Sequence, residues 1–153
     1  MLNRTPAAAD GRHWDDPRAF YRTSTSTSPL QITGDAPPWV APVTRRLATL
    51  LELGTNWRGS PSARIEPRLA ENAVNAVLAL VMPTAEGPVP QVVPLVDGGL
   101  QLEWHQGGWD IEVSLSPLGE VWIDAASADG LIEWADHFAA RREDLALLLQ
   151  SIA

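Results

Sequence analysis

Cysteine and lysine are both absent from the 153 residues of the chain. Without cysteine the chain can form no disulfide, no thiolate nucleophile and no thiolate metal site. Without lysine, all eleven cations are arginines, and only Arg45–Arg46 and Arg141–Arg142 are adjacent. Because phosphate backbones are bound by clustered cations, we do not expect the protein to bind nucleic acid.

Long apolar runs are missing as well. No stretch of the sequence approaches the roughly 18 apolar residues of a membrane span, and no apolar run follows the N-terminal residues as it does in a secretory signal. We therefore expect a cytoplasmic protein without membrane contact. Hydrophobic residues make up 45% and charged residues 20% of the chain, which is the composition of an ordinary globular domain.

Positive charge is scarce, so the formal net charge is −8. An acidic surface favours a basic protein partner through electrostatic steering and complementarity. The alternative interpretation is that the charge only keeps the protein soluble. The sequence does not indicate an oligomeric state.

The first 38 residues differ in composition from the rest. They contain the polar run Thr23–Ser28 and end at Pro37-Pro38, and they have too little apolar surface to offset the entropy of ordering the chain. We therefore expect a disordered tail over residues 1–38 and a single domain over residues 39–153. Three aromatic residues of the tail form a candidate binding motif: Trp14, Phe20 and Tyr21.

Two helices are predicted between residues 40 and 82. In the first, apolar residues recur at helical spacing up to Leu51, and Gly54 is expected to end the helix in the left-handed conformation. The second begins at Pro67, which suits a first helical turn, and ends before Pro83. The loop between them contains Trp57 and Gly59, which form a further candidate binding element.

Turn sequences at near-regular intervals predict a four-stranded antiparallel β-meander within residues 91–125. The turns are Asp97-Gly98, Gly107-Gly108 and Pro117-Leu118-Gly119. If Gly107-Gly108 is a two-residue turn, Leu102 lies opposite Val113 and the other apolar residues of these strands share that face. The third turn gives the same division between the two faces, so the register is well specified.

This register predicts a row of carboxylates on the other face of the sheet. Glu103, Glu112 and Asp124 lie side by side across three strands, with Asp110, His105 and Trp122 around them. Like charges directly opposite each other cost roughly 0.2–1 kcal/mol per pair. A basic partner, a covering arginine or a metal ion could compensate, or the face could simply be solvated. Three carboxylates on a flat sheet are poorly gathered for a divalent ion, so we expect no metal and no cofactor.

A helix is predicted from about Asp129 to Ser151, with Leu131, Trp134, Ala135 and Phe138 on its inner face. The predicted fold class is therefore α+β: two helices, a four-stranded antiparallel β-meander, and a C-terminal helix packed on the apolar face of the sheet.

Two stretches resemble a bacterial protein family of uncharacterised function. Its pattern is a Trp-x-Gly loop followed by an Asp-Gly-Gly turn and a Leu-Glu-Trp strand, which here are residues 57–59 and 97–104. The family usually has Asp after the first Trp, where this chain has Arg58, so a role for that acid would not transfer. The resemblance spans about residues 45–125 and implies a small bacterial accessory protein, without an activity.

No residue pattern typical of an enzyme is present. The sequence lacks a glycine-rich phosphate loop, an HExxH helix and a serine elbow. His105 with Asp110 is the only histidine–acid pair that the predicted register brings together. We therefore expect no catalytic residues and a binding protein that masks or carries a basic bacterial partner, like an immunity protein, an antitoxin or a chaperone. Two alternatives remain open: a small enzyme using His105 with nearby carboxylates, and a scaffold that recruits partners through its tail.

Overall fold

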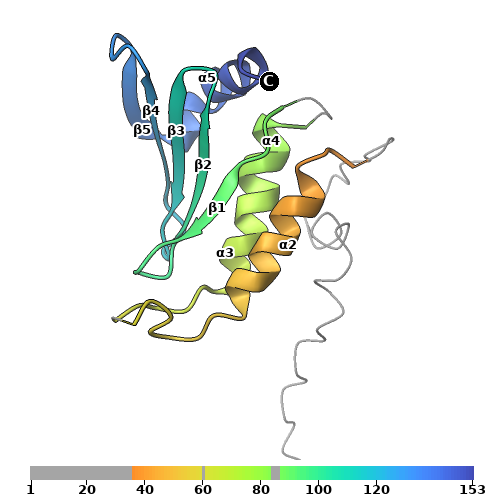
Figure 1. The fold of residues 1–153 in the computed structure, drawn as a ribbon, viewed down its shortest axis with the longest axis vertical. Coiled ribbons are helices and arrows are strands. Elements are labelled where there is room, and N and C mark those ends of the chain that lie inside the picture. The colour runs from red at the N-terminus through yellow and green to blue at the C-terminus, as the bar shows by residue number, and fades with distance from the viewer. Residues whose placement is uncertain (1–35, 60, 84–86) are drawn as a thin grey trace, which may run out of the picture.

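The computed structural model of the chain describes residues 36–59, 61–83 and 87–153. Within these ranges the predicted α+β class is confirmed, with helices on one side of a single antiparallel sheet (Figure 1). The aromatic residues of the predicted tail, Trp14, Phe20 and Tyr21, lie outside the described residues.

The first helix, α2 (Val40–Leu51), buries one stripe of residues at helical spacing. Its end differs from the prediction, because Gly54 is not in the left-handed region and Asn56 has the positive φ of 58° instead. The backbone N–H of Leu53 donates to the carbonyl of Leu50 at 3.1 Å, so a simple turn ends the helix. The buried residues are Val40, Val43, Thr44, Leu47 and Leu50.

The second helix is continuous from Pro67 to Val81, but its middle is wider than an α-helix. It consists of α3 (Pro67–Asn72), the π-helical segment η2 (Ala73–Leu78) and α4 (Ala79–Val81). The buried residues recur every four positions, and in an α-helix such a repeat drifts by about 40° around the axis at each step. The wider π-helical turn offsets this drift, so the buried residues form two columns that stay on the side of the helix facing the core. The columns are Leu69, Ala73, Val77 and Val81, and Ala70, Val74, Leu78 and Met82.

A buried tryptophan joins the two ends of this helical pair. Trp39, which precedes α2, is only 1% exposed, and its indole N–H donates to the carbonyl of Met82 at 2.9 Å. The indole N–H of Trp104 is satisfied in the same way by the carbonyl of Pro88. Both large rings therefore enter the core without leaving a polar group unpaired.

The sheet has the order β1-β2-β3-β4-β5, and every neighbouring pair is antiparallel. Its first four strands are β1 (Gln91–Pro94), β2 (Leu100–Gln106), β3 (Trp109–Leu115) and β4 (Val121–Ser127). The predicted register is confirmed, because Leu102 lies opposite Val113 and Glu112 lies opposite Asp124. One face of these strands is therefore apolar and buried beneath the helices.

The turns explain why the register is fixed. Gly107 and Gly108 have φ values of 61° and 76°, as the two-residue turn between β2 and β3 requires. A Cβ atom on Gly107 would lie 2.7 Å from Ile152, so the C-terminal segment also excludes a side chain there. Gly119 has a φ of 91° in the three-residue loop between β3 and β4.

A fifth strand corrects the prediction for residues 129–137. β5 (Glu133–His137) pairs with β4, and the last helix, α5, spans Phe138–Ser151. Asp129 and Gly130 lie in a turn: the side chain of Asp129 accepts hydrogen bonds from Ser127 and Leu131, and Gly130 has a φ of 69°. Trp134 and Ala135 are consequently strand residues and not part of a helix face.

α5 packs on the apolar side of the sheet near β4 and β5 and against the end of the second helix. Its buried residues are Phe138, Leu145 and Leu149, which join the same core as the sheet and the other helices. The predicted packing of a C-terminal helix on the apolar face is thus confirmed over a shorter helix. The opposite face of the sheet carries no helix in the described part of the chain (Figure 1).

Candidate functional site

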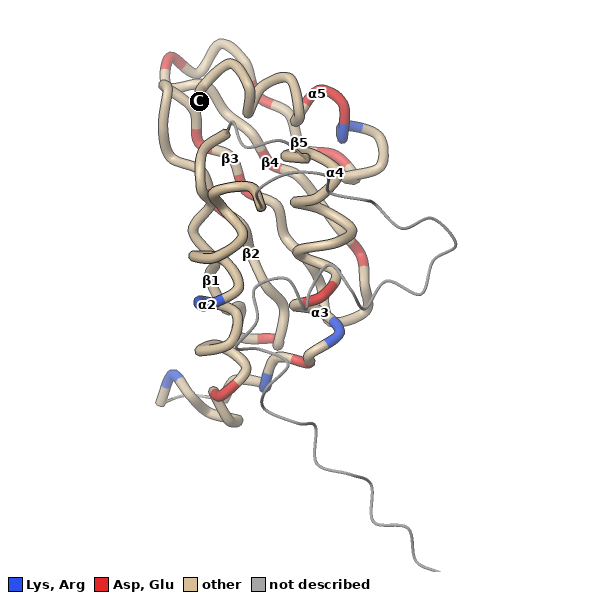
Figure 2. The backbone as a smooth tube through the Cα atoms, turned by 90° about the vertical axis from the view of Figure 1, so that its right-hand side faces the viewer, with Lys and Arg blue, Asp and Glu red and all other residues tan. Residues whose placement is uncertain are grey.

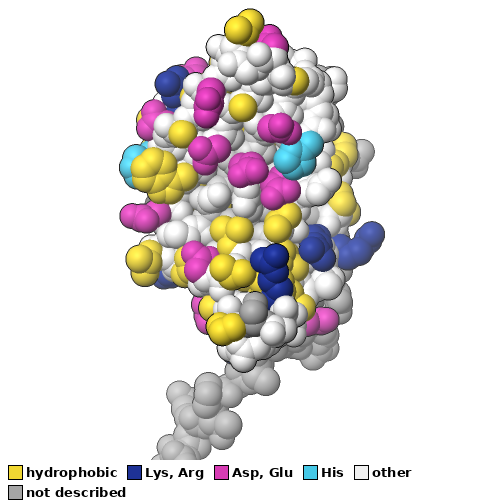
Figure 3. All heavy atoms as spheres, turned by 60° about the vertical axis from the view of Figure 1, so that its left-hand side comes forward, with side chains coloured by type: hydrophobic (Ala, Val, Ile, Leu, Met, Phe, Trp, Pro, Cys, Tyr) yellow, Lys and Arg dark blue, Asp and Glu magenta, His cyan; other side chains and the backbone are white. Residues whose placement is uncertain are grey.

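Five carboxylates project from the uncovered side of the sheet, and we call this surface the acidic face. The register places all five on the same side, because residues opposite each other in a ladder share a face. Figure 3 shows acidic side chains gathered on this side, with a histidine at each margin of the cluster. The residues are Glu103, Asp110, Glu112, Asp124 and Glu133.

Three of these carboxylates form the predicted row. Glu103 on β2 lies opposite Glu112 on β3, and Glu112 lies opposite Asp124 on β4. Glu112 therefore has an acidic residue directly opposite it on each neighbouring strand, and neighbouring strands are about 4.8 Å apart. The row ends at Ala135 on β5, beyond Asp124.

No strand of the sheet contains an arginine. Among the described residues, the arginine ion pairs join Arg64 to Glu66 and Arg141 to Asp136 and Asp144, and none reaches the acidic face. The covering arginine that could have compensated the row is therefore not found in this part of the chain.

One group that is cationic when protonated does lie on the acidic face. His105 contacts Asp110 through Nδ1 at 2.8 Å and Glu103 through Nε2 at 3.2 Å. Since a carboxylate faces each ring nitrogen, both nitrogens act as donors when the ring is protonated. The hydrogen bond to Asp110, followed by that to Glu103, raises the pKa of His105 above its ordinary value.

An aromatic pair borders the row on the β4–β5 side. The rings of Trp122 and His137 have centroids 3.7 Å apart and planes tilted by 32°, and these residues lie opposite each other in the ladder. Trp122 remains 41% exposed. Tryptophan is enriched among the residues that anchor protein interfaces.

Charge is segregated along the chain. Residues 87–153 contain eleven carboxylates and two arginines, whereas residues 36–83 contain three carboxylates and five arginines. Figure 2 shows the corresponding separation, with most basic positions on α2, α3 and the loop between them. Since the two arginines of α5 balance its two carboxylates, the negative charge of the described residues belongs to the strands of the sheet and the turns between them.

The loop with Trp57 and Gly59 is not part of the acidic face. The indole N–H of Trp57 donates to the carbonyl of Ala63 within the same loop at 3.3 Å, and Gly59 has a φ of 72°. The loop is attached beside the β1–β2 turn by a hydrogen bond from Ala63 N–H to the carbonyl of Val96. That turn is at the opposite end of β2 from His105, so the structure does not bring the two candidate sites together.

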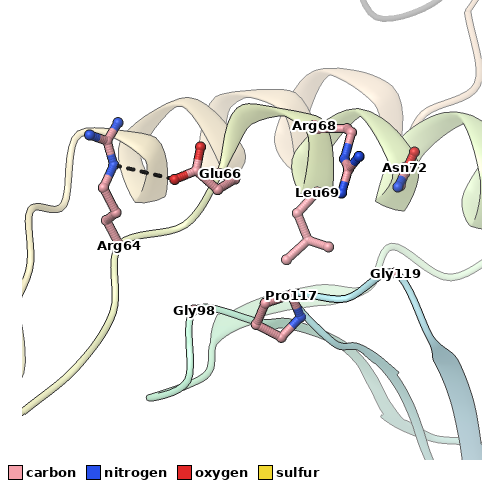
Figure 4. Close-up of a pocket in the computed structure, with 8 residues that line it drawn as sticks. All are labelled: Arg64, Glu66, Arg68, Leu69, Asn72, Gly98, Pro117 and Gly119. Carbon is pink, nitrogen blue, oxygen red and sulfur yellow. Dashed lines mark ion pairs between the residues drawn. The ribbon is translucent and has the colours of Figure 1, made fainter.

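A hollow of about 260 Å³ lies at this same end, between α3 and the turns of the sheet. Figure 4 shows Leu69 pointing toward Pro117 across it, while Arg64 forms an ion pair with Glu66 at 3.9 Å. His105 does not line this hollow.

The prediction missed two residues on the acidic side of the sheet, Glu133 and His137. Both were assigned to a helix, because apolar residues from Leu131 to Phe138 happen to match helical spacing. The Asp129-Gly130 turn was the signal that could have placed them in a hairpin.

Comparisons with protein-family models, with curated proteins and with solved structures give no significant match. Among the described residues, no group of three His, Asp or Glu side chains is gathered closely enough to hold a metal ion. In the same part of the chain, none of the helices combines the length and apolarity of a membrane span.

Proposed function

We propose that the protein is a non-enzymatic binding protein whose acidic face masks or carries a basic protein partner. The observation that supports this is the presence of five carboxylates on one sheet face whose strands contain no arginine. Such a face repels itself in the free protein, and a cationic partner relieves the repulsion on binding. Trp122 adds an exposed aromatic contact beside the row.

The geometry of His105 favours this function over catalysis. A general base needs a ring nitrogen with a free lone pair near its substrate. Carboxylates lie 2.8 and 3.2 Å from the two nitrogens of His105, and they favour the protonated ring. When protonated, His105 therefore serves better as a cation that orients Glu103 and Asp110 than as a general base.

Glu112→Gln tests the proposal, because Glu112 has a carboxylate on each side. The probe is a flexible peptide of alternating arginine and glycine-serine units, and its affinity is measured by calorimetry. We expect the isolated variant to be as stable as the parent or more stable, by up to about 1 kcal/mol. Binding of the probe should weaken by up to about fivefold at low salt, and by less at high salt, as for exposed charge pairs.

Glu143→Gln is the matched control. It removes the same charge from α5, on the other side of the sheet, and it should leave the affinity for the probe close to that of the parent. Equal effects of the two variants would show that only net charge matters and would contradict binding at the acidic face. A marked loss of stability in Glu112→Gln would show that Glu112 is needed within the fold. Capture of partners from the native host then identifies the protein that binds.

A further inference from the structure

The two edges of the sheet differ in their protection. At the β1 edge, the guanidinium of Arg46 on α2 donates to the outward carbonyl of Val92 at 3.1 Å. Capping an edge with a helix and a charged side chain is a common way of preventing strand addition. At the β5 edge, Arg141 on α5 pairs with the side chain of Asp136, but among the described residues no side chain bonds to an outward backbone group of Glu133 or Ala135.

The hydrogen-bond pattern identifies which backbone groups of β5 point outward. Ser127 N–H donates to the carbonyl of Ile132, so in this antiparallel ladder every second pair from there is hydrogen-bonded. Trp134 and Asp136 therefore bond to β4, whereas the N–H and C=O groups of Glu133 and Ala135 point away from the sheet. Among the described residues, no backbone hydrogen bond is found at these outward groups.

The open edge stops at His137. The backbone N–H of His137 donates to Oδ1 of Asp136 at 2.8 Å, and α5 begins at the next residue. An added strand can therefore pair with a short segment centred on Ala135, where antiparallel pairing needs no change in the sheet.

The side chains beside this edge specify the added strand. On the acidic face, Glu133 provides a carboxylate next to it, and Ala135 leaves an open path toward Asp124 in the next strand. On the other face lie Ile132, which is 50% exposed, and Trp134, which is half-buried and has the guanidinium of Arg141 5.6 Å from the centre of its ring. Alternating basic and apolar side chains fit these two surfaces, because neighbouring residues of a strand point to opposite faces.

We propose that β5 accepts an added strand from the basic partner, with basic and apolar residues alternating along it. This inference rests on the proposed function, since it specifies how the partner of the acidic face is bound. Main-chain hydrogen bonds to Glu133 and Ala135 give affinity, and the alternating side chains give specificity. The charge around the edge makes a second copy of this acidic chain the less favourable occupant.

Backbone N-methylation separates strand addition from charge attraction. The probe is a peptide of alternating arginine and valine, made in two N-methylated forms that block one or the other of its edges. We expect the unmethylated peptide to bind. One methylated form should bind about tenfold more weakly, because a backbone group of β5 loses its hydrogen-bond partner. The other form should bind nearly as tightly as the unmethylated peptide. Equal affinities of the two methylated forms, or no binding of the parent peptide, would overturn the inference.

Ala135→Pro tests the same edge from the side of the protein. Its N–H points outward, so proline removes no bond to β4, and edge positions tolerate proline. The variant should keep the circular dichroism of the parent and lose about tenfold in affinity for the alternating peptide. The flexible arginine peptide should bind it as it binds the parent. An unchanged affinity for the alternating peptide would overturn the inference.

Amide hydrogen exchange in the unaltered protein keeps the test independent of how well Ala135→Pro folds. The alternating peptide should slow exchange at the outward amides of Glu133 and Ala135, while Trp134 and Asp136 are already protected. If these amides are protected without peptide and in proportion to protein concentration, the edge binds a second copy and the inference is wrong. If Glu112→Gln weakens binding but the edge amides do not respond, the proposed function stands and strand addition fails.

Discussion

His105 lies between two carboxylates of the acidic face. It connects Glu103 on its own strand with Asp110 on the next strand, and when protonated it places one positive charge between these two negative charges. The hydrogen bond to Asp110, and then that to Glu103, raises the pKa of His105 from its ordinary value of 6.5. The proton on this ring is thus coupled to the folded state.

His105→Gln should make stability less dependent on pH. Because the pKa of His105 is raised in the folded state, the stabilisation that protonated His105 contributes is fully present below about pH 6.5. It is lost as the pH rises through the raised pKa. The variant should therefore lose more unfolding free energy at pH 6 than at pH 9. The loss should be below about 1 kcal/mol because the side chain is 42% exposed and solvent screens the pair. Urea denaturation at the two pH values measures it.

Asp110→Asn serves as the control for this prediction, since it removes the larger cause of the raised pKa. It should reduce the pH dependence in the same direction. An equal loss at both pH values would show that His105 acts through packing and not through its charge.

The residue scale also shows where prediction from sequence stops. The pairing of His105 with Asp110 follows from the register, because the two residues lie opposite each other. The contact with Glu103 and the stacking of Trp122 on His137 depend on side-chain rotamers and on β5. The periodicity of the sequence does not specify these.

At the scale of elements, the meander is the best-determined part of the fold. Turn residues and alternation specify the same register independently, so an error in one would have conflicted with the other. β5 was missed because five residues are too few for alternation to outweigh a helix-like spacing of apolar residues. The π-helical segment was missed because residue propensities do not distinguish it from an α-helix.

Substitutions in the apolar face of the meander should be costly. Leu102 and Val113 lie opposite each other and have 0% exposure. We expect Leu102→Ala to lower the unfolding free energy by about 2–5 kcal/mol and Val113→Ala by about 2 kcal/mol. Chemical denaturation measures both values.

Ser114→Ala is the comparison for Val113→Ala, because Ser114 is adjacent in the chain and points to the other face. It should change the unfolding free energy by no more than about 0.5 kcal/mol. Similar losses at positions 113 and 114 would contradict the division of the sheet into a buried and an accessible face.

At the scale of the whole molecule, charge separation accompanies the layered fold. The helices α2 and α3 and their loop carry most of the described arginines, and the sheet carries only carboxylates and histidines as charged groups. The net charge of −8 is evident from composition. The gathering of five carboxylates on one face could be predicted only in part, since Glu133 joins the face through a strand that the sequence pattern did not reveal.

Added salt should stabilise the isolated protein. Raising NaCl from about 0.01 M to about 0.15 M shortens the Debye length from about 30 Å to about 8 Å, which weakens repulsion across the acidic face. The thermal midpoint should therefore rise over this range. The double variant Glu112→Gln, Asp124→Asn should show a smaller rise, and a midpoint that falls with salt would show that attractive pairs dominate the charge interactions of the fold.

The π-helical segment has a consequence for comparing this chain with others. Its buried residues recur every four positions, as in Leu69, Ala73 and Val77. Removal of one residue between Val74 and Val77 would leave intervals of four and three, the spacing of an ordinary α-helix. A relative with a regular α-helix here should therefore align with this chain across a one-residue gap at Asn75 or Ala76, with the buried residues on both sides still in correspondence.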